Sequence, residues 1–205
     1  IEWTVASQPL ADPPGTKYAY SNFGYCILGR LIEKLTGLPF SQAVQREILA
    51  KCGVTAMRIG GNKRAERAPD EVVYHTTDPA ASAPYGMNVT RMDSHGGWIA
   101  TAGDLVRFAM RVDGFPAPPD ILRADTIKTM TTPGAVNPGY ACGWAVNAAN
   151  NRWHNGGLPG TASILVRTAS GLCWAALANA RTPGIGPAMD QLMWKIAKTV
   201  PEWHA

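Results

Sequence analysis

A tyrosine and an asparagine two residues apart, Tyr20 and Asn22, stand directly before an apolar run of the sequence. The apolar residues recur at helical spacing: Phe23, Ile27, Leu28, Leu31, Ile32 and Leu35. Ser21 or Asn22 is a suitable N-cap, and we predict a helix over about 22–36 with a buried apolar face. A phenol held at the mouth of that helix could relay protons if a nearby cation stabilises the phenolate, and the amide could hold a substrate carbonyl. The plainer alternative is a capped helix with a packed tyrosine.

A second polar group, His154-Asn155-Gly156-Gly157, stands before an apolar run near the C-terminal end of the chain, and Thr161 follows it. Two further segments lie between the groups: residues 95–105, which begin His-Gly-Gly-Trp, and residues 140–144, Tyr-Ala-Cys-Gly-Trp. Together with Tyr20-Ser21-Asn22, these segments in this order resemble the serine beta-lactamase and penicillin-binding-protein superfamily, especially its class C-like and esterase-like branch. The resemblance extends over nearly the whole chain.

That family has three motifs: Ser-x-x-Lys, Tyr-x-Asn, and either Lys-Thr-Gly or His-x-Gly. The second matches Tyr20-Ser21-Asn22 and the third matches His154-Asn155-Gly156. The first is missing, because no lysine of this chain has a serine three residues before it. In the family the nucleophile lies upstream of Tyr-x-Asn, whereas only 19 residues precede Tyr20 here and the chain begins with Ile1. We therefore expect the C-terminal part of a longer protein, whose nucleophile-bearing segment lies outside this sequence.

The resemblance implies catalytic roles for four residues. Tyr20 would be the acid/base group of acyl transfer, and Asn22 would orient the missing lysine or the substrate amide. His154 would stand where many relatives carry a lysine. The backbone N–H of Gly157 would be one of the donors that stabilise the oxyanion.

The resemblance also implies contacts with the substrate. The residues concerned are Asn155, Gly156 and Thr161. The glycines at 156 and 157 would let the strand approach the substrate closely. For Asn155 and Thr161 an ordinary structural role is the main alternative, and for His154 it is a hydrogen-bonded strand histidine.

The order of elements predicts an α+β fold. Helices are expected near 22–36, 40–49, 102–112, 124–131 and 187–199, and strands near 140–147, 152–154, 162–168 and 172–178. Residues 1–135 would form a helical and loop lobe that carries Tyr-x-Asn. Residues 136–205 would supply antiparallel strands and a C-terminal helix that carry His-x-Gly. The resemblance implies a beta-lactamase/transpeptidase-like fold, an antiparallel sheet with flanking helices beside a helical lobe, with the N-terminal strands and the nucleophile helix absent.

The amino-acid composition limits the classes of molecule that this chain is expected to bind. The net charge of +4 is modest, and no block of like charges suggests nucleic acid. No apolar stretch is long enough to span a membrane. The histidines show no metal-ligand spacing, so we expect no metal and no cofactor. The family resemblance favours a periplasmic or secreted location.

The function expected from the resemblance is that of a serine hydrolase acting by acyl-enzyme transfer on an ester, an amide or a beta-lactam. The His-x-Gly form occurs in relatives that act on esters and on peptides of D-amino acids, and it weakens the case for a dedicated beta-lactamase. One alternative is a non-catalytic penicillin-binding-protein-like module that binds a peptide or protein partner. Another is an accessory domain whose strands pair with a second chain. A small-molecule or peptide substrate is expected in the first case, and association through an unpaired sheet edge is expected if partner strands are missing.

Overall fold

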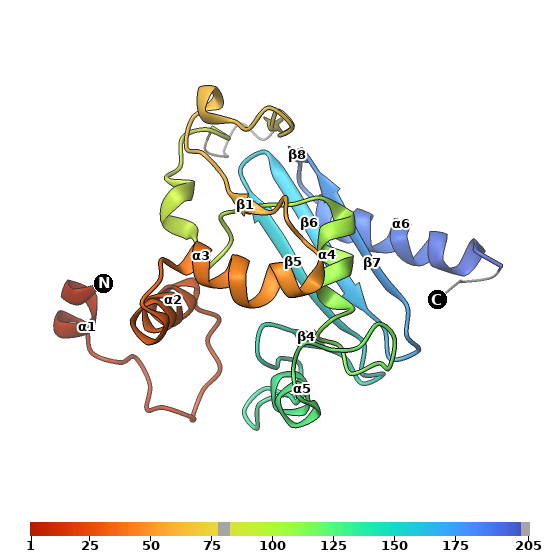
Figure 1. Cartoon of the computed structure of the whole chain (residues 1–205), viewed down its shortest axis with the longest axis horizontal. Coiled ribbons are helices and arrows are strands. Elements are labelled where there is room, and N and C mark those ends of the chain that lie inside the picture. The colour runs from red at the N-terminus through yellow and green to blue at the C-terminus, as the bar shows by residue number, and fades with distance from the viewer. Residues whose placement is uncertain (78–82, 202–205) are drawn as a thin grey trace.

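A four-stranded antiparallel sheet forms the centre of the molecule (Figure 1). The computed structural model describes residues 1–77 and 83–201. The strands are β4 (Ala145–Val146), β5 (Arg152–Leu158), β6 (Thr161–Arg167) and β7 (Cys173–Ala178), and they lie in this order. The register places Gly156 opposite Ser163 and Gly157 opposite Ala162.

Helices cover both faces of this sheet, as the continuous apolar runs of its strands predict. On one face, Leu165 of β6 packs in a cluster with Ala109 of α4 (Ala102–Ala109). On the other face, Ile164 and Val166 pack with Ala197 of α6 (Ile185–Thr199). Neighbouring residues of β6 therefore anchor opposite layers, and Figure 1 shows α4 and α6 on the two sides of the strands.

The remaining elements surround the sheet (Figure 1). The helices are α1 (Glu2–Ser7), α2 (Asn22–Thr36), α3 (Phe40–Val44) and α5 (Ala124–Thr131), and α3 continues into the π turn η1 (Gln45–Leu49) and the 3₁₀ turn η2 (Ala50–Cys52). Further 3₁₀ turns are η3 (Arg64–Glu66) and η4 (Val89–Met92). Two short pairs of strands complete the set: β1 (Arg58–Ile59) with β3 (Trp98–Ile99), and β2 (His75–Thr76) with β8 (Ala180–Arg181). Among the described residues, no helix has the length and apolarity that crossing a membrane requires.

The helix starts and stops follow the sequence closely. The Ser21 hydroxyl accepts a hydrogen bond from the Gly24 N–H at 3.0 Å, and Gly37 ends α2 with a φ of 69°. Thr101 and Asp104 form the capping box of α4.

The expected strand over 140–147 is wrong for most of its length, because only Ala145–Val146 is extended and paired. Gly143 has a φ of 76°, which turns the chain back so that Tyr140 bridges to Ala145. This turn brings Tyr140 to the sheet, beside the strand that carries His154.

The buried apolar face expected for α2 is also wrong. Gly29 is the one buried residue of this helix. Its apolar side chains are between 37% and 76% exposed: Phe23, Ile27, Leu28, Leu31, Ile32 and Leu35. The apolar period is real, but no described element covers that face.

Specific contacts with the loop before β3 hold α2 in place instead. A Cβ at Gly29 would lie 2.5 Å from Ser94 Cβ and would overlap Ser94 Oγ, so the helix backbone rests directly on this serine. The next residue, Arg30, donates a hydrogen bond to the carboxylate of Asp93. Glu33 accepts a hydrogen bond from the Phe40 N–H at 2.8 Å, which joins α2 to α3.

The contact at Gly29 makes a testable distinction between two glycines of one helix. We expect Gly29→Ala to lower the free energy of unfolding by about 1–3 kcal/mol, because the added methyl group overpacks the contact with Ser94. Gly24→Ala should be neutral or stabilising by up to ~1 kcal/mol, since its Cβ would meet Ser21 at an ordinary 3.6 Å. Denaturant unfolding of both variants measures the difference, and equal effects would contradict the close packing of α2.

Candidate active site

A cleft of about 890 Å³ lies between the mouth of α2, the part of strand β5 that extends beyond its pairing with β4, and the segments that surround β1 and β3. Every residue that the sequence singled out as a site residue lines it: Tyr20, Asn22, His154, Asn155, Gly156, Gly157 and Thr161. Residues more than a hundred positions apart in the sequence therefore share one concave surface. Their chemical roles are not tested by this placement and stay predictions.

Tyr20 reaches the sheet from the N-terminal end of α2. The Ser21 cap fixes the chain direction at this point, so Tyr20 and Asn22 lie on either side of the cap. The centre of the Tyr20 ring is 6.2 Å from the centre of the His154 ring. Tyr20 is 54% exposed, which leaves it open to a molecule in the cleft.

His154 is engaged at both ring nitrogens. Nδ1 lies 2.8 Å from the carbonyl oxygen of Asn155, and Nε2 lies 3.0 Å from the hydroxyl of Tyr140. A carbonyl oxygen can only accept, so Nδ1 carries a proton in this arrangement. Nε2 of the neutral ring is then an acceptor, and the Tyr140 hydroxyl is the donor.

Tyrosines gather around this histidine. The Tyr140 ring lies 5.4 Å from the Tyr18 ring and 6.2 Å from the Tyr20 ring, measured between their centres. Burial raises the pKa of Tyr140 above its usual value, and the neighbouring phenols of Tyr25, Tyr20 and Tyr18 raise it further. Burial likewise raises the pKa of Tyr25. Tyr140 therefore remains protonated, and able to donate, at neutral pH.

The two glycines of β5 lie directly against side chains of the protein itself. A Cβ at Gly156 would overlap the hydroxyl of Ser163 on β6. A Cβ at Gly157 would overlap the guanidinium of Arg181. The protein's own side chains thus fill the space that these glycines leave, while the close approach of a substrate to the strand stays a prediction.

Comparison with known proteins places this arrangement in a family. The family model described as Beta-lactamase matches residues 4–198. The chain belongs to this family.

Two curated relatives match most of this chain. The chain is 28% identical over 184 residues to penicillin-binding protein 4 of Amycolatopsis lactamdurans, a match that covers 82% of this chain and 48% of the relative. It is 25% identical over 170 residues to a putative D-alanyl-D-alanine carboxypeptidase of Escherichia coli strain K12, covering 70% of this chain and 38% of the relative. The chain thus spans less than half the length of either protein.

Solved structures confirm the beta-lactamase-like fold. A penicillin-binding protein from Bacillus halodurans superposes with a TM-score of 0.74 at 15% identity, over 96% of this chain and 62% of that one. The D-amino acid amidase of Ochrobactrum anthropi SV3 complexed with D-phenylalanine gives a TM-score of 0.73 at 19% identity, with the same coverages.

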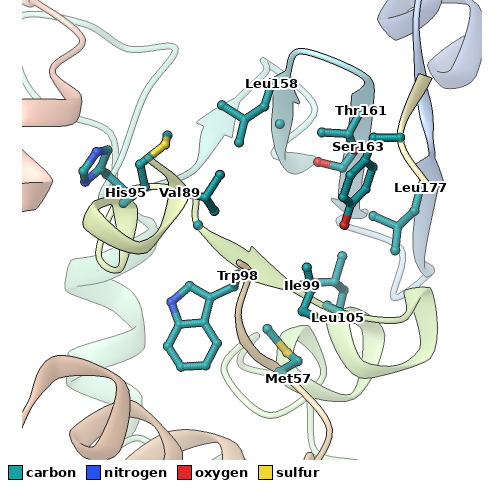
Figure 2. A pocket seen from close by; sticks show the side chains of 18 of the residues that line it. Met57, Val89, His95, Trp98, Ile99, Leu105, Leu158, Thr161, Ser163 and Leu177 are labelled. Carbon is teal, nitrogen blue, oxygen red and sulfur yellow. The ribbon is translucent and has the colours of Figure 1, made fainter. Parts of the chain in front are cut away.

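One wall of this beta-lactamase-family cleft is apolar, and its apolar character was not predicted from the sequence. Figure 2 shows the side chains of Met57, Trp98, Ile99, Leu105 and Leu177 around the cavity. The pairing of β1 with β3 brings Trp98 and Ile99 to this wall, close to Met57 just before β1. Two strands of two residues each are too short to produce a periodic signal.

Tyr140 was also not assigned to the site from the sequence. It belongs to a segment that contributes to the family resemblance, Tyr140–Trp144, but nothing in the spacing places its hydroxyl beside His154. The available signal was Gly143, because a glycine inside an apparent strand often marks a turn or a close backbone approach.

The fit of β5 against β6 can be tested with a double-mutant cycle. Gly156→Ala should lower the free energy of unfolding by about 1–3 kcal/mol, because the new methyl group and the Ser163 hydroxyl cannot occupy one place. In a Ser163→Ala background the same change should cost less by at least ~0.5 kcal/mol, since Ser163 Cβ itself is 3.6 Å from the added atom. Additive effects in denaturant unfolding would contradict the contact.

Proposed function

We propose that this chain supplies the acid/base group and the oxyanion strand of a serine hydrolase that works through an acyl-enzyme. The substrate is an ester, an amide or a beta-lactam, and the nucleophile belongs to a segment outside these 205 residues. Such a hydrolase is within the chemistry of the Beta-lactamase family, whose relatives here include proteins named carboxypeptidase and amidase.

The observation that carries the proposal is the meeting of two distant motifs in one cleft. Tyr20 at the mouth of α2 faces His154 of β5 with 6.2 Å between ring centres, and Gly157 lies on the same strand. Acyl transfer needs a group that moves a proton and fixed donors where negative charge develops. Tyr20 is suited to the first task and the N–H of Gly157 to the second.

The nucleophile has no good candidate among the described residues of the cleft. Two serines line it, Ser94 and Ser163, and none of the described lining residues is a lysine. The Ser94 hydroxyl is buried against Gly29, and the Ser163 hydroxyl lies against Gly156. Among the described residues, neither serine hydroxyl donates a hydrogen bond to a group that could act as its base, which an activated nucleophile requires.

Two features support a further segment that packs against this chain. The apolar side chains of α2 are exposed on the helix that also carries Asn22. The chain spans less than half the length of the two relatives described above. A segment that covers α2 would reach the cleft at Tyr20 and Asn22, and we propose that it brings the serine.

The proposed reaction has two balanced halves. The serine oxygen bonds to the substrate carbonyl carbon while its proton passes through Tyr20 to the leaving oxygen or nitrogen, whose bond to the carbonyl carbon breaks. Water then attacks the acyl carbon, the bond between that carbon and the serine oxygen breaks, and a proton of the water passes through Tyr20 to the serine oxygen. In both halves the N–H of Gly157 stabilises the carbonyl oxygen as it gains charge.

The role of Tyr20 is tested in the form of the protein that carries the nucleophile. Tyr20→Phe should lower kcat on an activated ester by ~10²–10⁴-fold while substrate binding changes little, because general acid/base groups contribute that much. Tyr18→Phe is the matched control, since it removes a hydroxyl two residues away, and its kcat should stay near wild type.

Two outcomes separate the alternatives. Near wild-type turnover in Tyr20→Phe would remove the central assignment. The absence of turnover in every form of the protein, combined with tight binding of a peptide, would favour a non-catalytic penicillin-binding-protein-like module.

A further inference from the structure

The two hydrogen bonds of the His154 ring restrict what this residue can do. Nδ1 faces the Asn155 carbonyl at 2.8 Å, and Nε2 faces the Tyr140 hydroxyl at 3.0 Å. An imidazole whose two nitrogens are both engaged has none left to exchange a proton with a substrate. In this arrangement the His154 ring is held in one orientation beside Tyr20 and does not act as a general base.

Tyr140 is held firmly enough to impose this orientation. Its backbone bridges to Ala145 at the start of β4, and Ala145 pairs with Trp153, the residue before His154. Its ring is partly buried and packs against the rings of Tyr18 and Tyr20. Both the main chain and the ring of Tyr140 are therefore tied to the strand that carries its partner.

We propose that Tyr140 is a positioning residue of this cleft, whose hydroxyl donates to Nε2 of His154 and holds the imidazole as the tautomer with its proton on Nδ1. The placement of the hydrogen bond stands on the geometry alone, and its importance for turnover rests on the proposed function. In this proposal Tyr20 transfers protons, and the oriented His154 ring forms part of the surface around Tyr20.

The burial of Tyr140 favours this direction of donation. Burial raises the pKa of its phenol, so the hydroxyl keeps its proton across the neutral range. A protonated imidazole would reverse the bond, since Nε2–H would then donate to the phenol oxygen. A measurement that locates the protons on the two ring nitrogens of His154 therefore also gives the direction of its hydrogen bond with Tyr140.

Nitrogen-15 spectroscopy of the histidine side chains provides that measurement on the full 205-residue chain. The signals of His154 are assigned by their loss in a His154→Gln variant. We expect a protonated, pyrrole-like Nδ1 and an unprotonated, pyridine-like Nε2 at neutral pH. In Tyr140→Phe the Nε2 signal should move toward the position of a pyridine-like nitrogen that accepts no hydrogen bond.

Tyr18→Phe is the matched control for this spectrum. Its ring also packs on Tyr140, at 5.4 Å, so it reproduces a loss of hydroxyl in the same aromatic group. The control should leave the Nε2 signal in place. A pyrrole-like Nε2 in the wild-type chain would overturn the proposal without any variant, and so would a Nε2 signal that does not respond to Tyr140→Phe.

A second readout tests the consequence for turnover in the form of the protein that carries the nucleophile. Tyr140→Phe should lower kcat about tenfold or more with little change in KM, because a misplaced group beside the reacting atoms slows the chemical step. Full kcat together with a shifted Nε2 signal would show that the hydrogen bond exists but does not position the site, which overturns the positioning role. If no form of the protein turns over a substrate, the proposed function fails while the spectrum still decides the hydrogen bond.

Discussion

The position of α2 depends on a backbone contact, and the cleft depends on the position of α2. Helices in small proteins are usually held by burying an apolar face, but this one leaves its apolar face exposed and buries Gly29. The missing side chain at Gly29 lets the helix rest on Ser94, and Arg30 pairs with the adjacent Asp93. A larger residue at Gly29 would lift the helix and carry Tyr20 and Asn22 away from β5.

The opposite side of the cleft is fixed by a different kind of constraint. Strand β5 is held along its whole length by β6, and β6 is clamped between α4 and α6. The edge of β5 is therefore rigid at His154 and Gly157, while the ring of His154 is oriented by Tyr140 and Asn155. If the mouth of α2 were mobile, the geometry that the proposed proton transfer needs would be lost, so the contacts of α2 with Asp93 and Ser94 matter for that proposal.

The sequence was sufficient wherever the signal is local. Ser21, one of the two N-caps predicted for α2, is the one that forms, and the left-handed Gly37 and the capping box at Thr101 mark helix ends by their own chemistry. Uniformly apolar strands correctly predicted a sheet covered on both faces. The candidate site residues were chosen because the Tyr-x-Asn and His-x-Gly patterns resemble those of a known family; all of them line one cleft, and their roles stay predictions.

Predictions from the sequence were wrong or missing where a contact joins residues distant in the sequence, or where burial depends on a second element packing against the first. The apolar period of α2 predicts a buried face, but burial depends on what lies opposite and no local pattern reports that. The Gly29 contact with Ser94 and the Tyr140 hydrogen bond to His154 are both produced by turns that bring the chain back on itself. The run 140–147 looks like one strand because its composition is strand-like, although Gly143 breaks it.

Intact-mass spectrometry after treatment with a fluorophosphonate probe tests the central claim most directly. The proposed function assigns the acid/base and oxyanion parts of an acyl-transfer site to this chain and the nucleophile to another segment. It predicts no covalent adduct on the 205-residue chain and one adduct per molecule on a polypeptide that includes the proposed upstream segment. A stoichiometric adduct on the 205-residue chain alone would show that the nucleophile lies among these residues and would contradict the account.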